Sequence, residues 1–196
     1  MAADIGFSCR CGALQGILHG ASAASGCHLV CYCKDCRAFA HRMGVADDLL
    51  PGGGSPLFQT TPAMIEITRG AERIACLRLS SKGLHRWYAA CCDTPLANTA
   101  GSSRIPFAGL WRPILADHTA LGPVRTLGFT QSALAGIGAP RKDKGLARMV
   151  GGLLRRGIAA YLSGEARKNP FFDSAGHPVA TPTIAGPTPP PAPRQQ

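Results

Sequence analysis

The sequence predicts a mainly β protein: a small β-rich domain followed by a C-terminal amphipathic helix and a disordered, proline-rich tail. Three observations support this prediction. Short β-type runs separated by Gly and Pro fill the chain up to about residue 140. Apolar residues recur at three- and four-residue steps within residues 141–168. Seven of the 16 prolines fall between Pro178 and Pro193, which is typical of a disordered tail. The expected parts are residues 1–140, 141–173 and 174–196.

The β-type runs of the first part show the alternation of half-buried strands. Ala63–Thr68 and Arg73–Leu79 alternate apolar and polar side chains, and Ile105–Trp111 is a third run. Pro51–Pro56 contains three glycines and predicts a loop. The first part is therefore expected to be a β domain with little helix.

The second part predicts one amphipathic helix. Its apolar stripe consists of Leu146, Met149, Val150, Leu153, Leu154, Ile158, Tyr161 and Leu162. Arginines lie on another face, at positions Arg148, Arg155 and Arg156. Three glycines weaken the helix by roughly 1 kcal/mol each relative to alanine, so it needs a surface to pack on. Docking on the β domain is favoured over contact with an anionic membrane or nucleic acid. Nucleic acid is the less expected partner because basic and aromatic residues are not interleaved here.

The composition leaves several partner classes open. In 196 residues, 45% are hydrophobic, which is enough for a buried core, and 21 Lys and Arg against 11 Asp and Glu give a net charge of +10. This charge permits nucleic acid, an anionic membrane or an acidic small molecule as partner. No apolar run approaches the roughly 20 residues that span a bilayer. The first residues also lack the features of a secretory signal. We therefore expect a cytoplasmic protein.

The strongest chemical signal is the run Cys31-Tyr-Cys33-Lys-Asp-Cys36. All nine cysteines lie between Cys9 and Cys92, and this odd, clustered set indicates a metal before it indicates disulfides. Thiolates select zinc or an iron–sulfur cluster, and three protein ligands leave the fourth tetrahedral position of zinc open, as in catalytic sites. The alternative is a closed structural site, for which the nearest fourth ligands are Cys27 and His28.

A second set of cysteines is split between Cys9-Arg-Cys11-Gly12 and the pair Cys91-Cys92. A metal held by both halves would cross-link distant parts of the domain and stabilise it. Neighbouring side chains on a strand point to opposite faces, so one of the vicinal cysteines is alternatively a core residue.

These blocks resemble the glutathione-dependent formaldehyde-activating enzyme/centromere protein V family. The resemblance covers about residues 7–115 and rests on the order of three blocks, which are Cys9–Gly12, Cys31–Arg37 and Arg86–Leu96. It implies a small zinc-binding β-tent (Mss4-like) fold with two zinc ions. A structural zinc would be held by Cys9, Cys11 and Cys92, and a catalytic zinc by Cys31, Cys33 and Cys36.

The sequence departs from the family pattern in the third block. Ala89 stands where the block should open with cysteine, and Asp93 stands where glycine follows the last cysteine. Cys91 is the expected replacement ligand, and Cys76 is a less favoured one. Either the structural zinc is held in this way, or it has been lost and the core has adapted.

The resemblance also implies an activity, which is carbon–sulfur bond formation of the lyase type. Glutathione's sulfur would fill the open position on the catalytic zinc and attack formaldehyde, giving S-hydroxymethylglutathione. The three cysteines would be ligands, and none would be the nucleophile. One alternative is a non-enzymatic zinc module that contacts protein or nucleic acid. Another is a related enzyme that acts on a different thiol or carbonyl.

Residues near the cysteine blocks have weaker signals. His28, His41 and His85 are candidate proton carriers, although a lone histidine is more often structural. The cations that can bind substrate carboxylates are Lys34, Arg37 and Arg86. Cys27 has no place in the family pattern and is expected to be a core residue.

Overall fold

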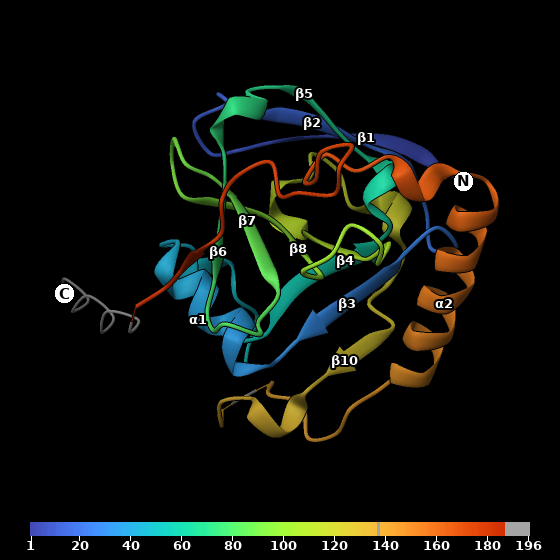
Figure 1. The fold of residues 1–196 in the computed structure, drawn as a ribbon. Coiled ribbons are helices and arrows are strands. Elements are labelled where there is room, and N and C mark those ends of the chain that lie inside the picture. Colours follow the sequence, from blue (N-terminus) through green and yellow to red (C-terminus); the bar gives the residue numbers. More distant parts are fainter. Residues whose placement is uncertain (137, 187–196) are drawn as a thin grey trace.

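The computed structural model describes residues 1–136 and 138–186. These residues contain two β-sheets and two α-helices, together with short 3-10 helices and loops (Figure 1). The first sheet is antiparallel, with the order β1-β2-β5, and contains β1 (Ala3–Ser8), β2 (Gln15–Ala21) and β5 (Ile65–Arg69). The second sheet has eight strands in the order β10-β3-β4-β9-β8-β7-β6-β11. The prediction of a mainly β protein is confirmed.

The eight-stranded sheet is antiparallel except at its two edges. Its strands are β3 (Cys27–Cys31), β4 (Ser55–Thr60), β6 (Ile74–Arg78), β7 (His85–Ala89), β8 (Thr94–Thr99), β9 (Ala108–Trp111), β10 (Thr126–Gly128) and β11 (Thr183–Ile184). At the edges, β10 pairs with β3 and β11 pairs with β6, both in parallel. Two of the expected strands, β5 and β6, lie within one or two residues of their predicted positions. The third begins only at Ala108, after Pro106, which has no N–H for a sheet hydrogen bond.

The main hydrophobic core lies between the two sheets. It contains side chains of the small sheet, such as Phe7 and Leu18, together with Trp87 and Phe58 of the large sheet. Side chains alternate along β7, so Trp87 faces this core while Arg86 points to the opposite face of the sheet. That opposite face carries the second core and the helix α1.

Helix α1 (Lys34–Arg42) was not expected from the sequence beyond a turn. Cys33 is its N-cap, and the Sγ of Cys33 accepts a hydrogen bond from the backbone N–H of Cys36. Asp35 lies in the first turn, where a negative charge is favourable to the helix dipole. Phe39 and Ala40 are buried against the sheet. The second half of the cysteine run is therefore helical.

Helix α2 (Leu146–Leu162) confirms the helix predicted for the second part, but less of its apolar face is covered than the sequence suggested. It runs beside β3 and β10 at one edge of the large sheet (Figure 1). Met149 packs on the second core, and Ala160 is buried. The other half of the predicted stripe is exposed, at Val150, Leu154, Ile158, Tyr161 and Leu162.

The helix therefore docks on the domain, as expected, but the domain covers only part of the apolar stripe. Arg156 lies on the packed side of the helix and donates a hydrogen bond to the side chain of Gln59 in β4. The sequence had placed this arginine on the polar face.

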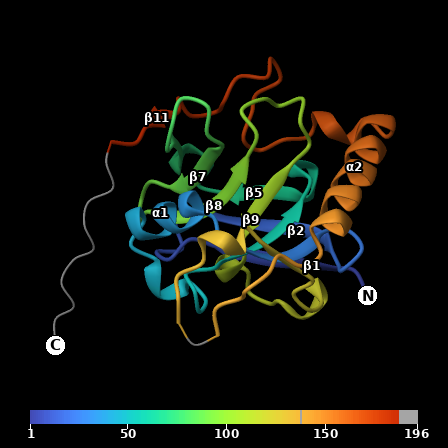
Figure 2. The ribbon, with the colours of Figure 1, turned by 90° about the horizontal axis from the view of Figure 1, so that it is seen from below.

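The residues after α2 are built into the domain. Phe171 and Phe172 are buried in the main core, and β11 lies on the side of the molecule opposite to α2 (Figure 2). The tail that was expected to be disordered from residue 174 is thus paired with β6 at Thr183–Ile184. Its last part, residues 187–196, lies outside the described residues. No helix among the described residues is long and apolar enough to cross a membrane.

Phe171→Leu should test how much this C-terminal segment stabilises the domain. The ring of Phe171 is fully buried and stacks on Trp87, with ring centroids 5.1 Å apart and an interplanar angle of 23°. Loss of the stacked ring and incomplete filling of its space should lower the free energy of unfolding by about 1–2 kcal/mol. Urea unfolding measures this change. Leu162→Ala, at a side chain that is 85% exposed, is the control and should change it by less than about 0.5 kcal/mol. Equal stability of both variants would contradict the assignment of Phe171 to the core.

Candidate metal centres

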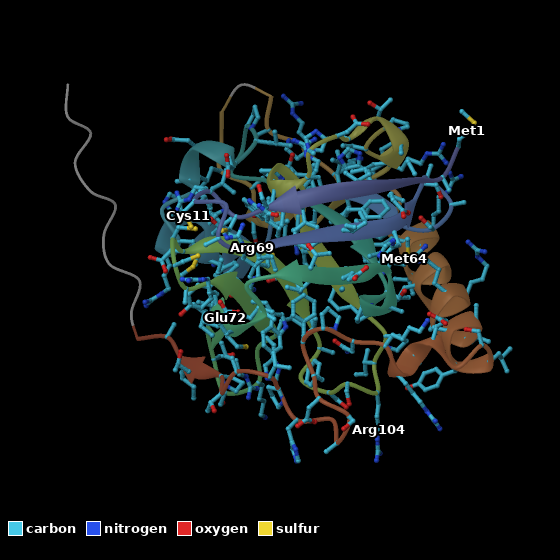
Figure 3. The ribbon with its side chains drawn as sticks, turned by 90° about the horizontal axis from the view of Figure 1, so that it is seen from above. Met1, Cys11, Met64, Arg69, Glu72 and Arg104 are labelled. Atoms are coloured by element: carbon cyan, nitrogen blue, oxygen red, sulfur yellow. The ribbon has the colours of Figure 1, made fainter. Side chains whose placement is uncertain are left out.

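The first cysteine group joins two hairpin turns. The four-cysteine cluster consists of Cys9, Cys11, Cys91 and Cys92, whose Sγ atoms all lie within 4.8 Å of one another. Cys9 and Cys11 follow β1, and Cys91 and Cys92 lie in the turn between β7 and β8. Figure 3 shows Cys11 at the end of the β1–β2 hairpin, with sulfur atoms gathered beside it. Residues about 80 positions apart therefore meet at one point.

Backbone geometry explains why these four thiols converge. Gly12 has a φ of +72° and donates its N–H to the carbonyl of Cys9, which closes a tight turn. Asp93 has a φ of +53° at the position where the resembled family has glycine, and aspartate tolerates this left-handed conformation better than most residues. Cys91 and Cys92 lie in a turn rather than on a strand, so strand alternation does not apply. Both thiols therefore belong to the cluster, and neither is a plain core residue.

The sulfur distances suit a tetrahedral metal. Zinc–sulfur bonds of about 2.3 Å in a tetrahedron place the sulfurs about 3.8 Å apart. The Sγ of Cys91 lies 3.8 Å from that of Cys9, 3.4 Å from that of Cys11 and 3.8 Å from that of Cys92. Four thiols at this spacing can hold a metal ion with no open position.

Arg10 ties the two halves of the four-cysteine cluster together. Its backbone N–H donates to the hydroxyl of Thr94 at 3.0 Å, and its guanidinium donates to the carbonyls of Cys92 and Met43. Ala89, at the position of the missing family cysteine, is fully buried in β7. The fourth thiol comes from Cys91, in agreement with the expected replacement, and Cys76 lies in the core away from the cluster.

The second group is the three-cysteine cluster, which consists of Cys31, Cys33 and Cys36. Cys31 ends β3, Cys33 caps α1, and Cys36 lies in the first turn of that helix. The Sγ atoms of Cys31 and Cys33 are 3.4 Å apart, and all three lie within 4.8 Å of one another. No fourth His, Cys, Asp or Glu joins this group within the described residues. Neither Cys27 nor His28 completes it.

The thiols of this cluster differ in acidity because of their contacts. Hydrogen bonds from the thiols of Cys31 and Cys36, with the backbone N–H of Cys36, lower the pKa of Cys33. Hydrogen bonding to Cys33 raises the pKa of Cys31. A negative charge is therefore favoured at the N-terminus of α1, where the helix dipole is positive.

Arg86 supplies a buried positive charge beside the three-cysteine cluster. It is 2% exposed, and its Nη1 donates to the Sγ of Cys36 at 3.8 Å and to Oδ1 of Asn98 at 3.2 Å. Its Nη2 lies 3.8 Å from a carboxylate oxygen of Asp35, and its guanidinium lies over the ring of Phe39. Arg86 thus places a positive charge beside the cluster, and it also lines the cavity described next.

A cavity of about 600 Å³ opens beside the three-cysteine cluster. All three cysteines line it, as do Lys34 and Arg86. Much of its remaining wall is apolar, with contributions from Leu29, Leu57, Leu84, Phe107, Met149 and Leu153. This volume is within the usual range for sites that bind small molecules. The apolar wall limits the number of water molecules next to the sulfurs.

The other sequence candidates lie away from this cavity. His28 is buried, with its Nδ1 2.7 Å from the carbonyl of Gly122, and burial lowers its pKa. His85 is buried in the core, where burial lowers its pKa too, and His41 is exposed on α1. None of these histidines is among the described residues that line the cavity.

Two further candidates have structural contacts. Arg37 donates to the carbonyl of Ser132 at 2.9 Å and so fixes the segment after β10. The thiol of Cys27 lies 3.3 Å from the hydroxyl of Thr126, apart from both clusters. Among the cations named from the sequence, Lys34 is the one left exposed at the cavity.

Comparison with known proteins adds a family without a known activity. Residues 1–182 match the model of a family described as "Family of unknown function (DUF6151)". No curated protein matches the chain. A crystal structure of a Rhodobacter sphaeroides protein is similar, with 20% sequence identity and a TM-score of 0.42. The match covers 61% of this chain and 96% of that one.

Proposed function

We propose that the protein is a zinc-dependent enzyme of the carbon–sulfur lyase type. The chain belongs to this family of unknown function, so the proposal rests on the geometry of its own sites. Its proposed reaction joins glutathione to formaldehyde and gives S-hydroxymethylglutathione. The observation that carries the proposal is the position of the three-cysteine cluster in the wall of a cavity large enough for a small substrate. The resemblance of the three cysteine blocks to the formaldehyde-activating family supplies the substrates.

The donor sets of the two clusters fit two different zinc roles. Four thiols complete a tetrahedron, so the four-cysteine cluster fits a structural ion. The three-cysteine cluster leaves one position for an external ligand and faces the cavity. Zinc held there lowers the pKa of an external thiol, so that the thiolate prevails near pH 7.

Arg86 makes an additional thiolate acceptable at the cluster. Three thiolates and one zinc ion carry a net charge of −1, which repels an incoming anion. The guanidinium of Arg86, which donates to Cys36 and also lies 3.8 Å from a carboxylate oxygen of Asp35, offsets part of this charge. Because Arg86 is buried, water screens this compensation little. Arg86, a residue of the third sequence block, thus reduces the repulsion that would otherwise oppose substrate binding.

The remaining cavity residues bind and orient the substrates. Lys34 is an exposed cation at the cavity and is placed to attract the carboxylates of glutathione. The sulfur of glutathione attacks the carbonyl carbon, the C–S bond forms, and the π electron pair of the carbonyl moves to its oxygen. The proton lost by the thiol ends on that oxygen, so the reaction needs no oxidant or further reactant.

Exchange spectroscopy on equilibrium mixtures of glutathione and formaldehyde tests this proposal, because the uncatalysed addition makes endpoint assays uninformative. The zinc-loaded protein should accelerate the interconversion of glutathione and S-hydroxymethylglutathione. Cys36→Ser should abolish the acceleration while leaving the circular dichroism spectrum unchanged. Cys27→Ser is the matched control and should retain the acceleration, because Cys27 lies outside both clusters. If the zinc-loaded protein neither accelerates the exchange nor binds glutathione in calorimetry, the proposal for these substrates fails.

A further inference from the structure

Another cavity, of about 320 Å³, is lined by a different face of α2 from the one that lines the cavity at the three-cysteine cluster. Its walls are α2, the start of β3 and the segments before β3 and β10. Four arginines line it, and we call it the arginine cavity: Arg125, Arg148, Arg155 and Arg156. No acidic residue is among the described residues that line it. The cavity therefore concentrates positive charge that the proposed reaction does not use.

The charge of the arginine cavity has no counter-charge from the protein. Within the described ranges, none of the four arginines forms a salt bridge. Arg155 donates to the carbonyl of Ala24, and Arg156 donates to the amide oxygen of Gln59, so both have neutral partners. The Nε of Arg156 is buried without a hydrogen-bond partner. Like charges gathered in this way repel one another, and a bound anion would relieve that repulsion.

Gly152 of α2 shapes the arginine cavity. Gly151 and Gly152 line the cavity, although glycine costs about 1 kcal/mol within a helix. A Cβ at Gly152 would lie 2.9 Å from the Nη1 of Arg156, whereas a Cβ at Gly151 would have no neighbour within 4 Å. The glycine at position 152 therefore leaves the space that the guanidinium of Arg156 occupies.

We propose that the arginine cavity binds a phosphate monoester. Four guanidinium groups exceed what one carboxylate can pair with, whereas a phosphate dianion offers several acceptor oxygens in the geometry that suits arginine. Two sources carry this chemistry: a free phosphorylated small molecule, or a lipid headgroup. The second source is favoured by the exposed apolar side chains of Val150, Leu154 and Ile158, on the same helix as three of the arginines.

Binding measurements with two probes test the proposal and separate the sources. Inorganic phosphate, which carries a single phosphate group, represents the free phosphate in calorimetry. Flotation with phosphatidylcholine vesicles that contain phosphatidylinositol 4-phosphate, against phosphatidylcholine alone, represents the headgroup. We expect binding of at least one probe. Arg148→Gln with Arg155→Gln should weaken it by about tenfold or more, because each lost arginine removes charge-assisted hydrogen bonds.

Matched controls separate the cavity from net charge. Arg141→Gln with Lys142→Gln removes two positive charges from exposed residues outside the cavity and should change binding by less than about twofold. Gly152→Ala should weaken binding, while Gly151→Ala should leave it unchanged. Binding of vesicles but not inorganic phosphate assigns the site to a headgroup, and the reverse assigns it to a free phosphate. Absence of binding to both probes, or equal binding by the two double variants, overturns the proposal.

Discussion

Cys33→Ser should lower the zinc content of the purified protein from about two equivalents per chain to about one. The Sγ of Cys33 lies 3.4 Å from that of Cys31 and accepts the N–H of Cys36, so it occupies the middle of the three-cysteine cluster. A serine hydroxyl stays protonated near pH 7 and is a poor ligand for a site built from thiolates. Two cysteines are then too few to retain the ion through purification.

Metal quantification by mass spectrometry measures this loss. Cys27→Ser is the control, because it removes a thiol on the same strand as Cys31 without touching either cluster. The control should keep about two equivalents. Unchanged zinc in Cys33→Ser would show that the three-cysteine cluster does not hold the metal, and the proposed function would lose its site.

The sequence predicted the cysteine groups better than it predicted their surroundings. Spacing alone indicated that Cys31, Cys33 and Cys36 converge, because an extended residue followed by a turn brings three nearby thiols together. The grouping of Cys9 and Cys11 with the Cys91-Cys92 pair was suggested by their clustering in the sequence, and the family resemblance supported it for Cys92 although Cys9 and Cys91 are 82 positions apart. Neither the cysteine spacing nor the family resemblance could predict that Arg86 is buried against Cys36, because this contact depends on which face of β7 is covered by α1.

The periodic pattern of α2 predicted a docked helix but not how much of its apolar face would be covered. Apolar periodicity indicates that a helix has a hydrophobic face, but it does not state how wide a surface will cover that face. The rim of the sheet covers only the side with Met149 and Ala160 and leaves Leu154 exposed. Arg156 reaches the interior because Gly152 leaves space for it and Gln59 offers an acceptor. These are tertiary contacts that a periodic pattern cannot contain.

The extent of disorder after residue 174 was misjudged for a related reason. Proline content indicates disorder, yet these residues directly follow Phe171 and Phe172, which fill the core beside Trp87 and belong to the part that was expected to pack on the domain. Burial of two aromatic rings holds the following residues near β6, where Thr183 and Ile184 pair with the sheet edge. The average composition of a segment does not show that single residues next to it, such as Phe171 and Phe172, fix it to the domain.

Cys11→Ser should lower the melting temperature of the metal-loaded protein by about 10 °C. The four-cysteine cluster links the β1–β2 hairpin to the β7–β8 turn, and a metal that binds only the folded chain stabilises it through its binding free energy. Losing one of four ligands should cost about 3–4 kcal/mol of that free energy, which corresponds to this shift in a chain of 196 residues. Cys11 is the appropriate position because its side chain is exposed, so the substitution leaves no cavity in the core.

Chelator treatment makes the test of Cys11→Ser specific to the metal. In the metal-free state both proteins should melt at similar temperatures, since an exposed substitution alone changes stability by less than about 0.5 kcal/mol. Restoring zinc should raise the melting temperature of the parent much more than that of the variant. Cys33→Ser should respond to zinc almost as the parent does, because an open three-ligand site cross-links only neighbouring residues of β3 and α1. A melting temperature of the parent that is insensitive to chelator would mean that the four-cysteine cluster stabilises the fold without a metal.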